Sequence, residues 1–446
     1  MKFKPNIRSF LKKTITNPLL INMATVISIT YAIKVIGFFK ESYIAYEYGL
    51  SAMIDTYLLA MIIPSLIQAV FLSSFSNVFV PNYVIALKQN KDIADFQASS
   101  FLLTIAISFL LVLIVYFFFE PFVEVFFPGH EPSYYEMISR QFYLLVLCIP
   151  FWGVSSLLTG MLNIENEYRF SSLTPIFIPI VTIIAIYFFQ EQLKESVLAA
   201  STLVGSILGF LYVLIVNKGK GLLRIGKPDL KDLNFIAMLK QVPYKMSSSL
   251  FTNLIPSVDK FFAAKLVVGS VAAISFGQKI PAFVLGFSIT GLGTVLLPYF
   301  SKLANENPKK AFKELFKILK ILFLGSLLII VALIYFSQEI VELLFQRNEF
   351  DNEDTEVVSR IQQILLLYVP FYLCGNVLVK FLTSFNKNKF MAKMSFMNFV
   401  VNIFLDYILF KNFGVYGIVM ATSIIYSINP IIYYMYAKSL SKKLFS

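Results

Sequence analysis

Three lysines stand inside long apolar segments, at Lys34, Lys40 and Lys279. A charged side chain at the centre of a membrane helix costs at least about 2.5–3.5 kcal/mol, so its presence there indicates a function. Ammonium groups neutralise phosphate oxygens as point charges. If the three lysines line one cavity, we expect a phosphorylated or otherwise acidic substrate. The alternative is that each lysine pairs with a carboxylate such as Glu41 or Asp55, or extends to the membrane surface.

A second group of residues offers only oxygen ligands. Asn402 and Asp406 are four positions apart, so their side chains share one face of a helix. Asp259 and Thr422 could complete the group. Oxygen ligands with one or two carboxylates suit a hard cation such as Na⁺, or a proton. The alternative is ordinary hydrogen bonding between membrane helices.

Residues for covalent chemistry are scarce. The chain has one histidine, His130, and two cysteines, Cys148 and Cys374, which both fall in apolar segments. A histidine-based metal site and a Ser-His triad are therefore excluded, and the cysteines are interpreted as core residues. The sequence also lacks the glycine-rich phosphate loop GxxxxGK[ST]. We expect a protein that is not an enzyme and requires no cofactor.

These residues must be positioned by membrane helices, because 57% of the chain is hydrophobic, 14% is charged and the mean hydropathy is +0.73. A helix needs about 20 apolar residues to cross the hydrocarbon layer. Twelve segments reach that length, and we predict an all-α polytopic membrane protein in which Pro64, Pro150, Pro281 and Pro370 bend their helices. The segments are 20–46, 54–87, 94–119, 135–162, 171–189, 194–217, 242–267, 270–301, 312–336, 356–385, 390–410 and 414–437.

The second half of the chain repeats the first. Arg140, Pro150, Phe151, Asn166 and Phe170 recur 220 positions later, as Arg360, Pro370, Phe371, Asn386 and Phe390. Pro64 and Pro81 recur 217 positions later, as Pro281 and Pro298. Six spans per repeat is an even number, so the two repeats are parallel, a design typical of secondary transporters with a central cavity. We predict a six-helix bundle over residues 1–217, an amphipathic cytoplasmic linker over 218–241 and a second six-helix bundle over 242–446.

The distribution of positive charge predicts the orientation. With the N-terminus in the cytosol, the outer flanks hold only Lys194, Lys265, Arg347 and Lys411, and the inner flanks hold most other basic residues, beginning with Lys2, Lys4 and Arg8. Basic residues favour the cytoplasmic side. The net charge of +12 is therefore interpreted as a topology signal and not as a nucleic-acid surface. We expect both termini in the cytosol and the N-terminal segment to be retained.

At these residues the chain resembles the MviN/MurJ family of lipid II flippases, within the superfamily that also holds polysaccharide flippases and multidrug extruders. The resemblance covers residues 20–438. Its most specific stretches are 293–298 (GTVLLP) and 344–350 (LFQRNEF), and residues 37–41 (GFFKE) add to it.

The resemblance implies roles for individual residues. The family's cavity arginines correspond to Lys34, Lys40 and Lys279, which would hold a pyrophosphate, with Glu41, Asp55 and Gln68 as other polar cavity residues. The sodium site of some members corresponds to Asp259, Asn402, Asp406 and Thr422. Two features depart from the family: Gln68 replaces a usual arginine, and the family usually has two more helices after the twelve expected here.

The leading hypothesis is a flippase that moves an undecaprenyl-pyrophosphate-linked saccharide, similar to lipid II, across the bacterial inner membrane by alternating access. Na⁺ binding near Asp259 and Asp406, or the membrane potential, would bias its transport cycle. Membrane lipid and cell-wall synthesis proteins would be its partners, and nucleic acid would not. The two departures favour one alternative, a flippase for a lipid-linked O-antigen or capsular polysaccharide unit. A cation-coupled multidrug extruder and a non-transporting scaffold for cell-wall assembly are further alternatives.

Overall fold

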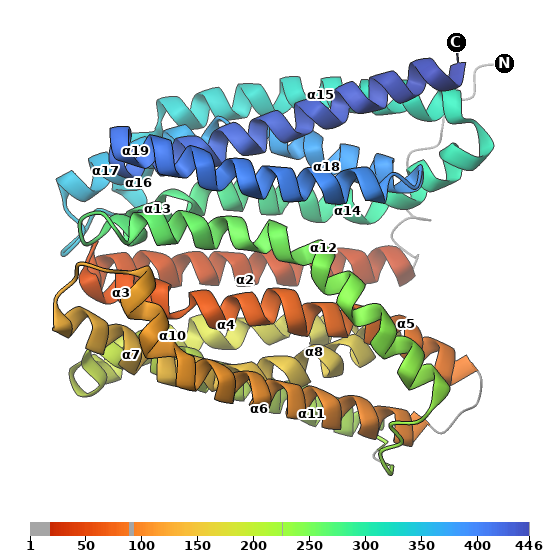
Figure 1. Ribbon diagram of the computed structural model, residues 1–446, viewed down its shortest axis with the longest axis horizontal. Helices are drawn as coiled ribbons and strands as arrows, with labels where there is room; N and C mark the ends of the chain where they lie inside the picture. Colours follow the sequence, from red (N-terminus) through yellow and green to blue (C-terminus); the bar gives the residue numbers. More distant parts are fainter. Residues whose placement is uncertain (1–17, 89–92, 225, 446) are drawn as a thin grey trace. The chain divides into compact units, whose positions relative to one another are not determined.

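The computed structural model describes residues 18–88, 93–224 and 226–445, and Figure 1 traces them from the N-terminal to the C-terminal helices. Every element in these ranges is a helix, apart from one isolated bridge between Arg347 and Phe350. The all-α prediction is therefore confirmed. The basic residues Lys2, Lys4 and Arg8, on which the predicted orientation partly depends, lie outside the described residues.

The helices follow one another in two series. The first comprises α2 (Pro18–Tyr48), α3 (Ala52–Ala60), α4 (Ile62–Leu66), the π-helical segment η1 (Ile67–Leu72), α5 (Ser73–Lys88), α6 (Ile93–Phe126), α7 (Pro132–Val146), α8 (Cys148–Ile164), α9 (Tyr168–Leu173), η2 (Thr174–Ile176), α10 (Phe177–Leu193), η3 (Lys194–Ser196) and α11 (Val197–Gly219). The second comprises α12 (Leu233–Ala263), α13 (Ser270–Gly277), α14 (Lys279–Glu306), α15 (Pro308–Tyr335), α16 (Ser337–Phe345), α17 (Asn352–Leu366), α18 (Val369–Ser384) and α19 (Asn388–Phe445).

The membrane-spanning character of the helices agrees with the sequence. In the part of the chain that the structure describes, seven helical stretches are long and apolar enough to cross a membrane. Two of these, Tyr168–Gly219 and Asn388–Phe445, each contain two of the expected segments. The three remaining expected segments coincide with α2, with α12 and with α13 followed by α14. The chain is a multi-pass membrane protein.

The prolines bend the helices where the sequence predicts. Helical geometry is interrupted at Met61, Leu147 and Gln278, each three residues before a proline, and at Leu367 and Tyr368, just before Pro370. Proline has no N–H to donate, and its ring collides with the carbonyl four residues earlier, so the turn preceding it opens. The interruptions divide four spans into α3 and α4, α7 and α8, α13 and α14, and α17 and α18.

The duplication is visible in the local backbone. Asn166 and Asn386, which are 220 positions apart, both adopt a left-handed conformation, with φ of 60° and 56°. Each follows a helix that closes in the same way, because the amides of Glu167 and Lys387 donate to carbonyls five residues earlier at 2.9 Å. Asparagine tolerates this conformation better than most residues, which explains why it recurs at both turns.

Two compact units make up the chain. The first unit contains Met1–Lys40, Ile63–Phe119 and Ser139–Met246, and the second contains Glu41–Ile62, Glu120–Ile138 and Ser247–Ser446. Phe79, Phe96 and Leu157 belong to the core of the first unit. Phe312 and Phe381 belong to the core of the second unit. Residues 41–62 and 120–138, which precede residue 246, thus belong to the second unit although the residues around them in the sequence belong to the first.

The predicted linker differs from an amphipathic helix over 218–241. Residues 222–224 and 226–232 are not helical, and α12 starts only at Leu233. Side chains of α6 hold this segment: Gln97 accepts a hydrogen bond from the amide of Arg224 at 2.8 Å, and Asp95 accepts one from the amide of Lys227 at 2.7 Å. These bonds take the backbone amides that a helix would use.

One glycine separates the last two expected spans. Within α19, Gly414 has φ 56° and ψ −133°, a strained backbone conformation that favours glycine. The chain therefore turns at this position, and the carbonyl of Leu409 packs against Gly417 so closely that a Cβ there would lie 2.1 Å from it. The predicted boundary between residues 410 and 414 is confirmed.

Candidate functional site

Lys279 forms an ion pair with Glu41 inside the second unit. Pro281 interrupts the helix at Gln278, so Lys279 becomes the first residue of α14. Its Nζ lies 2.9 Å from Oε2 of Glu41, and the two side chains are 26% and 20% exposed. The ammonium is therefore balanced by a carboxylate but still accessible, and an incoming anion could compete for it.

A further lysine that the sequence did not assign to the site, Lys260, belongs to the same region. Its Nζ donates a hydrogen bond of 3.5 Å to the carbonyl of Leu58, close to the end of α3. Lys260 and Lys279 are also near enough to repel each other. The second unit thus brings two cationic groups near each other, with Glu41 beside Lys279 and Asp259 beside Lys260.

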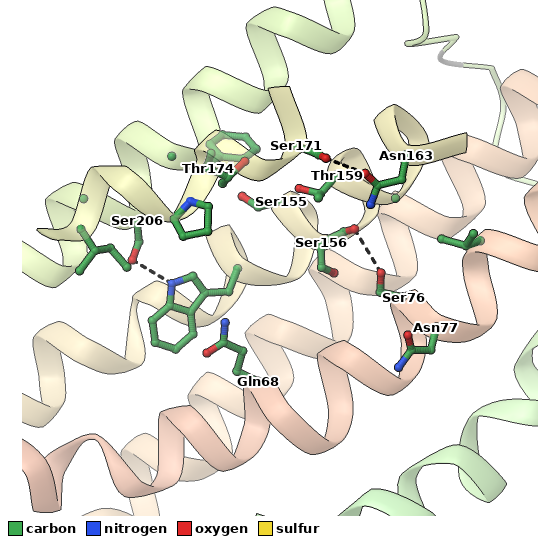
Figure 2. A pocket seen from close by; sticks show the side chains of 18 of the residues that line it. Gln68, Ser76, Asn77, Ser155, Ser156, Thr159, Asn163, Ser171, Thr174 and Ser206 are labelled. Carbon is green, nitrogen blue, oxygen red and sulfur yellow. Dashed lines mark hydrogen bonds between the residues drawn. The ribbon is translucent and has the colours of Figure 1, made fainter. Parts of the chain in front are cut away.

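Lys34 and Lys40 lie on α2, where both side chains are half-buried. They belong to the first compact unit, whereas Lys279 belongs to the second. A common cavity for the three lysines therefore remains a prediction. Gln68 lies in the π-helical segment η1 of the first unit, where its exposed side chain lines a cavity among neutral residues, as Figure 2 shows.

Asp55 is 1% exposed and binds backbone amides. Its two carboxylate oxygens accept hydrogen bonds of 2.7 Å, one from the amide of Gly269 and one from the amide of Ala272. These amides lie at the N-terminus of α13, where backbone N–H groups lack partners within the helix and the helix dipole favours a negative charge. Asp55 therefore fastens α3 to α13.

The four predicted cation ligands come together in the second unit. Thr422 Oγ1 donates a hydrogen bond of 2.7 Å to Oδ2 of Asp259. Asp259 lies on α12 and is 3% exposed, while Asn402 and Asp406 lie on α19 and are each 0% exposed. The carboxylates of Asp259 and Asp406 are close enough to interact.

Several oxygen atoms of this cluster lack a protein partner. Among the residues that the structure describes, Oδ1 of Asp259, both carboxylate oxygens of Asp406 and Oδ1 of Asn402 are buried without a hydrogen bond. Two buried carboxylates cannot both stay ionised unless a positive charge compensates them. The cluster is suited to a hard cation with oxygen ligands, or to a proton held between the carboxylates.

The sequence suggested this group of residues from helix spacing, oxygen-bearing side chains and the family resemblance. It paired residues as far apart as Asp259 and Asp406, because carboxylates within apolar segments are rare. It did not assign Lys260 a role, although Lys260 is also a charged residue within an apolar segment. It also did not predict the cavity beside Gln68, because serine and threonine are common in membrane helices and give no distinct signal.

Comparison with known proteins gives a consistent result. A family model described as "Lipid II flippase MurJ" matches residues 44–445. A probable lipid II flippase MurJ from Buchnera aphidicola subsp. Baizongia pistaciae is 26% identical over 424 residues, which cover 91% of this chain and 81% of the relative. The lipid II flippase MurJ of Burkholderia cenocepacia is 24% identical, with 81% of this chain and 71% of the relative covered.

Solved structures share the fold. The inward closed conformation of a lipid II flippase MurJ aligns with a TM-score of 0.79 and 22% identity, and the alignment covers 92% of this chain and 86% of that chain. An inward-facing multidrug resistance MATE family transporter of the MOP superfamily aligns with a TM-score of 0.74 and 12% identity, over 95% of this chain and 100% of that chain.

Proposed function

Because the chain belongs to the lipid II flippase MurJ family, whose model matches residues 44–445, we propose that it moves lipid II across the bacterial inner membrane. This match over nearly the whole chain is the observation that carries the proposal. The reaction is a translocation by alternating access, in which no covalent bond of the substrate changes. The substrate is an undecaprenyl-pyrophosphate-linked saccharide.

Lys279, Lys34 and Lys40 would bind the pyrophosphate. In the free protein Lys279 is balanced by Glu41 at 2.9 Å. An arriving pyrophosphate carries more negative charge than one carboxylate, so it would displace Glu41 from the ammonium. Release on the other side would restore the ion pair. This exchange keeps Lys279 partnered throughout the cycle, which avoids an unpaired charge within the membrane.

The cluster around Asp259 and Asp406 would bind the coupling cation. Its buried, unpartnered oxygens fit Na⁺. When bound, the cation supplies the positive charge that allows both carboxylates to be ionised, and Thr422 orients Asp259 through their hydrogen bond. The membrane potential would add about 2.3 kcal/mol per charge for each 100 mV.

In this proposal both termini lie in the cytosol, because most basic residues flank the membrane on that side. Proteins of cell-wall synthesis would supply the substrate and accept it. A second candidate substrate is a lipid-linked surface-polysaccharide unit. It is favoured by Gln68, which provides a neutral amide in span 2 where the resemblance led us to expect an arginine.

Complementation tests the proposal. A bacterial strain depleted of its own lipid II flippase would receive the wild-type chain, Lys279→Ala or Lys302→Ala at equal membrane levels. Lys302 is a matched control because its side chain is 74% exposed and its carboxylate partner lies 3.9 Å away. We expect rescue by the wild type and by Lys302→Ala, and failure of Lys279→Ala. Absence of rescue by well-expressed wild type would favour the polysaccharide unit instead.

A further inference from the structure

The first unit contains a cavity of about 580 Å³ that the lysine and carboxylate clusters do not use. It is formed by η1 and α5, α8, the segment from α9 to α10, and α11, so it lies within one compact unit. Figure 2 shows side chains from these helices converging on it. Small-molecule sites typically measure about 300–1,000 Å³, so the cavity is large enough to hold a ligand.

The lining of this cavity is mostly apolar surface with neutral polar groups set into it, and no charged residue lines it in the part of the chain that the structure describes. Its hydroxyl and amide groups include those of Gln68, Ser155, Thr159, Asn163, Ser171 and Thr174. Some of them bind each other: Ser171 Oγ donates to Asn163 Oδ1 at 2.6 Å. Thr174 Oγ1 is buried and has no hydrogen-bond partner among the described residues. The cavity therefore offers neutral donors and acceptors, some of which are free for a ligand.

The repeat demonstrates that the fold does not require these polar groups. At the offsets of 217 and 220, Gln68 corresponds to Leu285, Thr159 to Val379 and Thr174 to Met394. Leu285 and Met394 are buried in the second unit, and Met394 is part of its apolar core. Polar groups without partners are unfavourable within a membrane. Gln68, Thr159 and Thr174 are therefore polar in only one of the two repeats, which favours a ligand that satisfies them.

An indole side chain also lines the cavity. Trp152 lines it, and its indole N–H donates a hydrogen bond of 2.9 Å to Ser206 Oγ, which fixes the ring. Pyranose rings present an apolar face of C–H groups that packs on aromatic rings, and hydroxyl and N-acetyl groups around the edge that form hydrogen bonds. A fixed tryptophan surrounded by neutral hydroxyls and amides complements both features.

We propose that this cavity binds the uncharged sugar part of the lipid-linked substrate. This inference rests on the proposed function and deepens it: the lysines hold the pyrophosphate, and the first unit recognises the saccharide. The cavity would then determine which sugar is accepted, and the lysines would separately determine that the substrate carries a pyrophosphate. A substrate that lacks the sugar would still meet the lysines but would leave the cavity unfilled.

Trp152 provides a direct test, because it is the only tryptophan of the chain. The full-length protein in nanodiscs would be titrated with N,N′-diacetylchitobiose, with lipid II and with undecaprenyl pyrophosphate, while tryptophan emission is recorded. We expect the two sugar-bearing probes to shift the emission and the sugar-free lipid to leave it unchanged. No shift with either sugar-bearing probe, or an equal shift with undecaprenyl pyrophosphate, would overturn the proposal.

Variants that copy the second repeat sharpen the test. Thr159→Val with Thr174→Met is expected to weaken chitobiose binding by at least about fivefold, because each change removes a hydrogen-bonding group. Thr104→Val, whose hydroxyl bonds only to the Ser100 carbonyl outside the cavity, is the matched control and should bind as the wild type does. Equal binding by the cavity variant and this control would contradict the proposal.

The two proposals can fail separately. If the wild type binds chitobiose at Trp152 but does not rescue the depleted strain, the sugar site is supported and the lipid II assignment is wrong. If the wild type rescues the strain but Trp152 responds to none of the sugars, the function is supported and the sugar site is wrong.

Discussion

Asp55 Oδ1 accepts a hydrogen bond of 2.7 Å from the backbone amide of Ala272, the residue 217 positions later that takes its own place in the second repeat. The equivalent helices α3 and α13 are thus joined through equivalent positions, but only one of the two carries a carboxylate. The contact is therefore asymmetric.

This relationship predicts a structural role for Asp55. Asp55→Ala leaves the amides of Gly269 and Ala272 buried without a partner, at a cost of about 1–3 kcal/mol for each group. We expect a lower melting temperature of the purified protein in detergent and a smaller loss for Asp55→Asn. Glu353→Ala, an exposed acidic residue, serves as the control. Unchanged melting combined with abolished transport would instead place Asp55 in substrate handling.

Glu41 is predicted to compete with the substrate. Glu41→Gln removes the negative charge 2.9 Å from Lys279, so the ammonium becomes more available to a pyrophosphate. We expect the apparent KM for lipid II transport to fall by about threefold to tenfold, which corresponds to about 0.7–1.4 kcal/mol. A rise in KM for Glu41→Gln would contradict this prediction and would indicate that Glu41 itself contacts the substrate.

The carboxylate cluster predicts a specific response to sodium. A cation that binds only the folded protein stabilises it by about 2.7 kcal/mol at 100 times its Kd. We expect NaCl, but not choline chloride at equal ionic strength, to raise the melting temperature of the wild type. Asp406→Asn should lose this response, since one of the two carboxylates is gone. Equal stabilisation by both salts would argue for a proton in place of Na⁺.

Gly414 predicts a purely conformational effect on stability. A Cβ at Gly414 would meet nothing within 4 Å, so Gly414→Ala introduces strain only through φ 56°, ψ −133°. We expect a destabilisation of about 1–3 kcal/mol. Gly325, which is equally open but lies inside α15, is the matched control, because alanine favours a helix by about 0.5–1 kcal/mol there. Equal melting temperatures for the two variants would contradict this account.

Much of the fold could be predicted because its causes are local. Pro64 and Pro281 interrupt their helices because proline lacks a backbone N–H and its ring clashes with the preceding turn. Asn166 and Asn386, at equivalent positions of the two repeats, each adopt a left-handed conformation at a turn. Charge in apolar surroundings similarly revealed Asp259 and Asp406, since its cost in the membrane leaves few positions where it is tolerated.

The remaining features depend on contacts between distant segments. Arg224 is not part of a helix, because Gln97, 127 residues away in the sequence, accepts the hydrogen bond of its amide. The pairing of Lys279 with Glu41 was one of several alternatives until their separation was known. The cavity at Trp152 is the space left between several packed helices, and the periodicity of any one helix does not predict that space.

Translocation of fluorescent lipid II in proteoliposomes tests the central claim most directly. Wild type, Lys279→Gln and Lys302→Gln would be reconstituted at equal amounts, and the rate at which labelled headgroup reaches the opposite leaflet would be measured. We predict transport by the wild type and Lys302→Gln, and a rate about 10 to 100 times lower for Lys279→Gln, since a charged hydrogen bond contributes about 1.5–3 kcal/mol. No transport by the folded wild type, or undiminished transport by Lys279→Gln, would contradict the account.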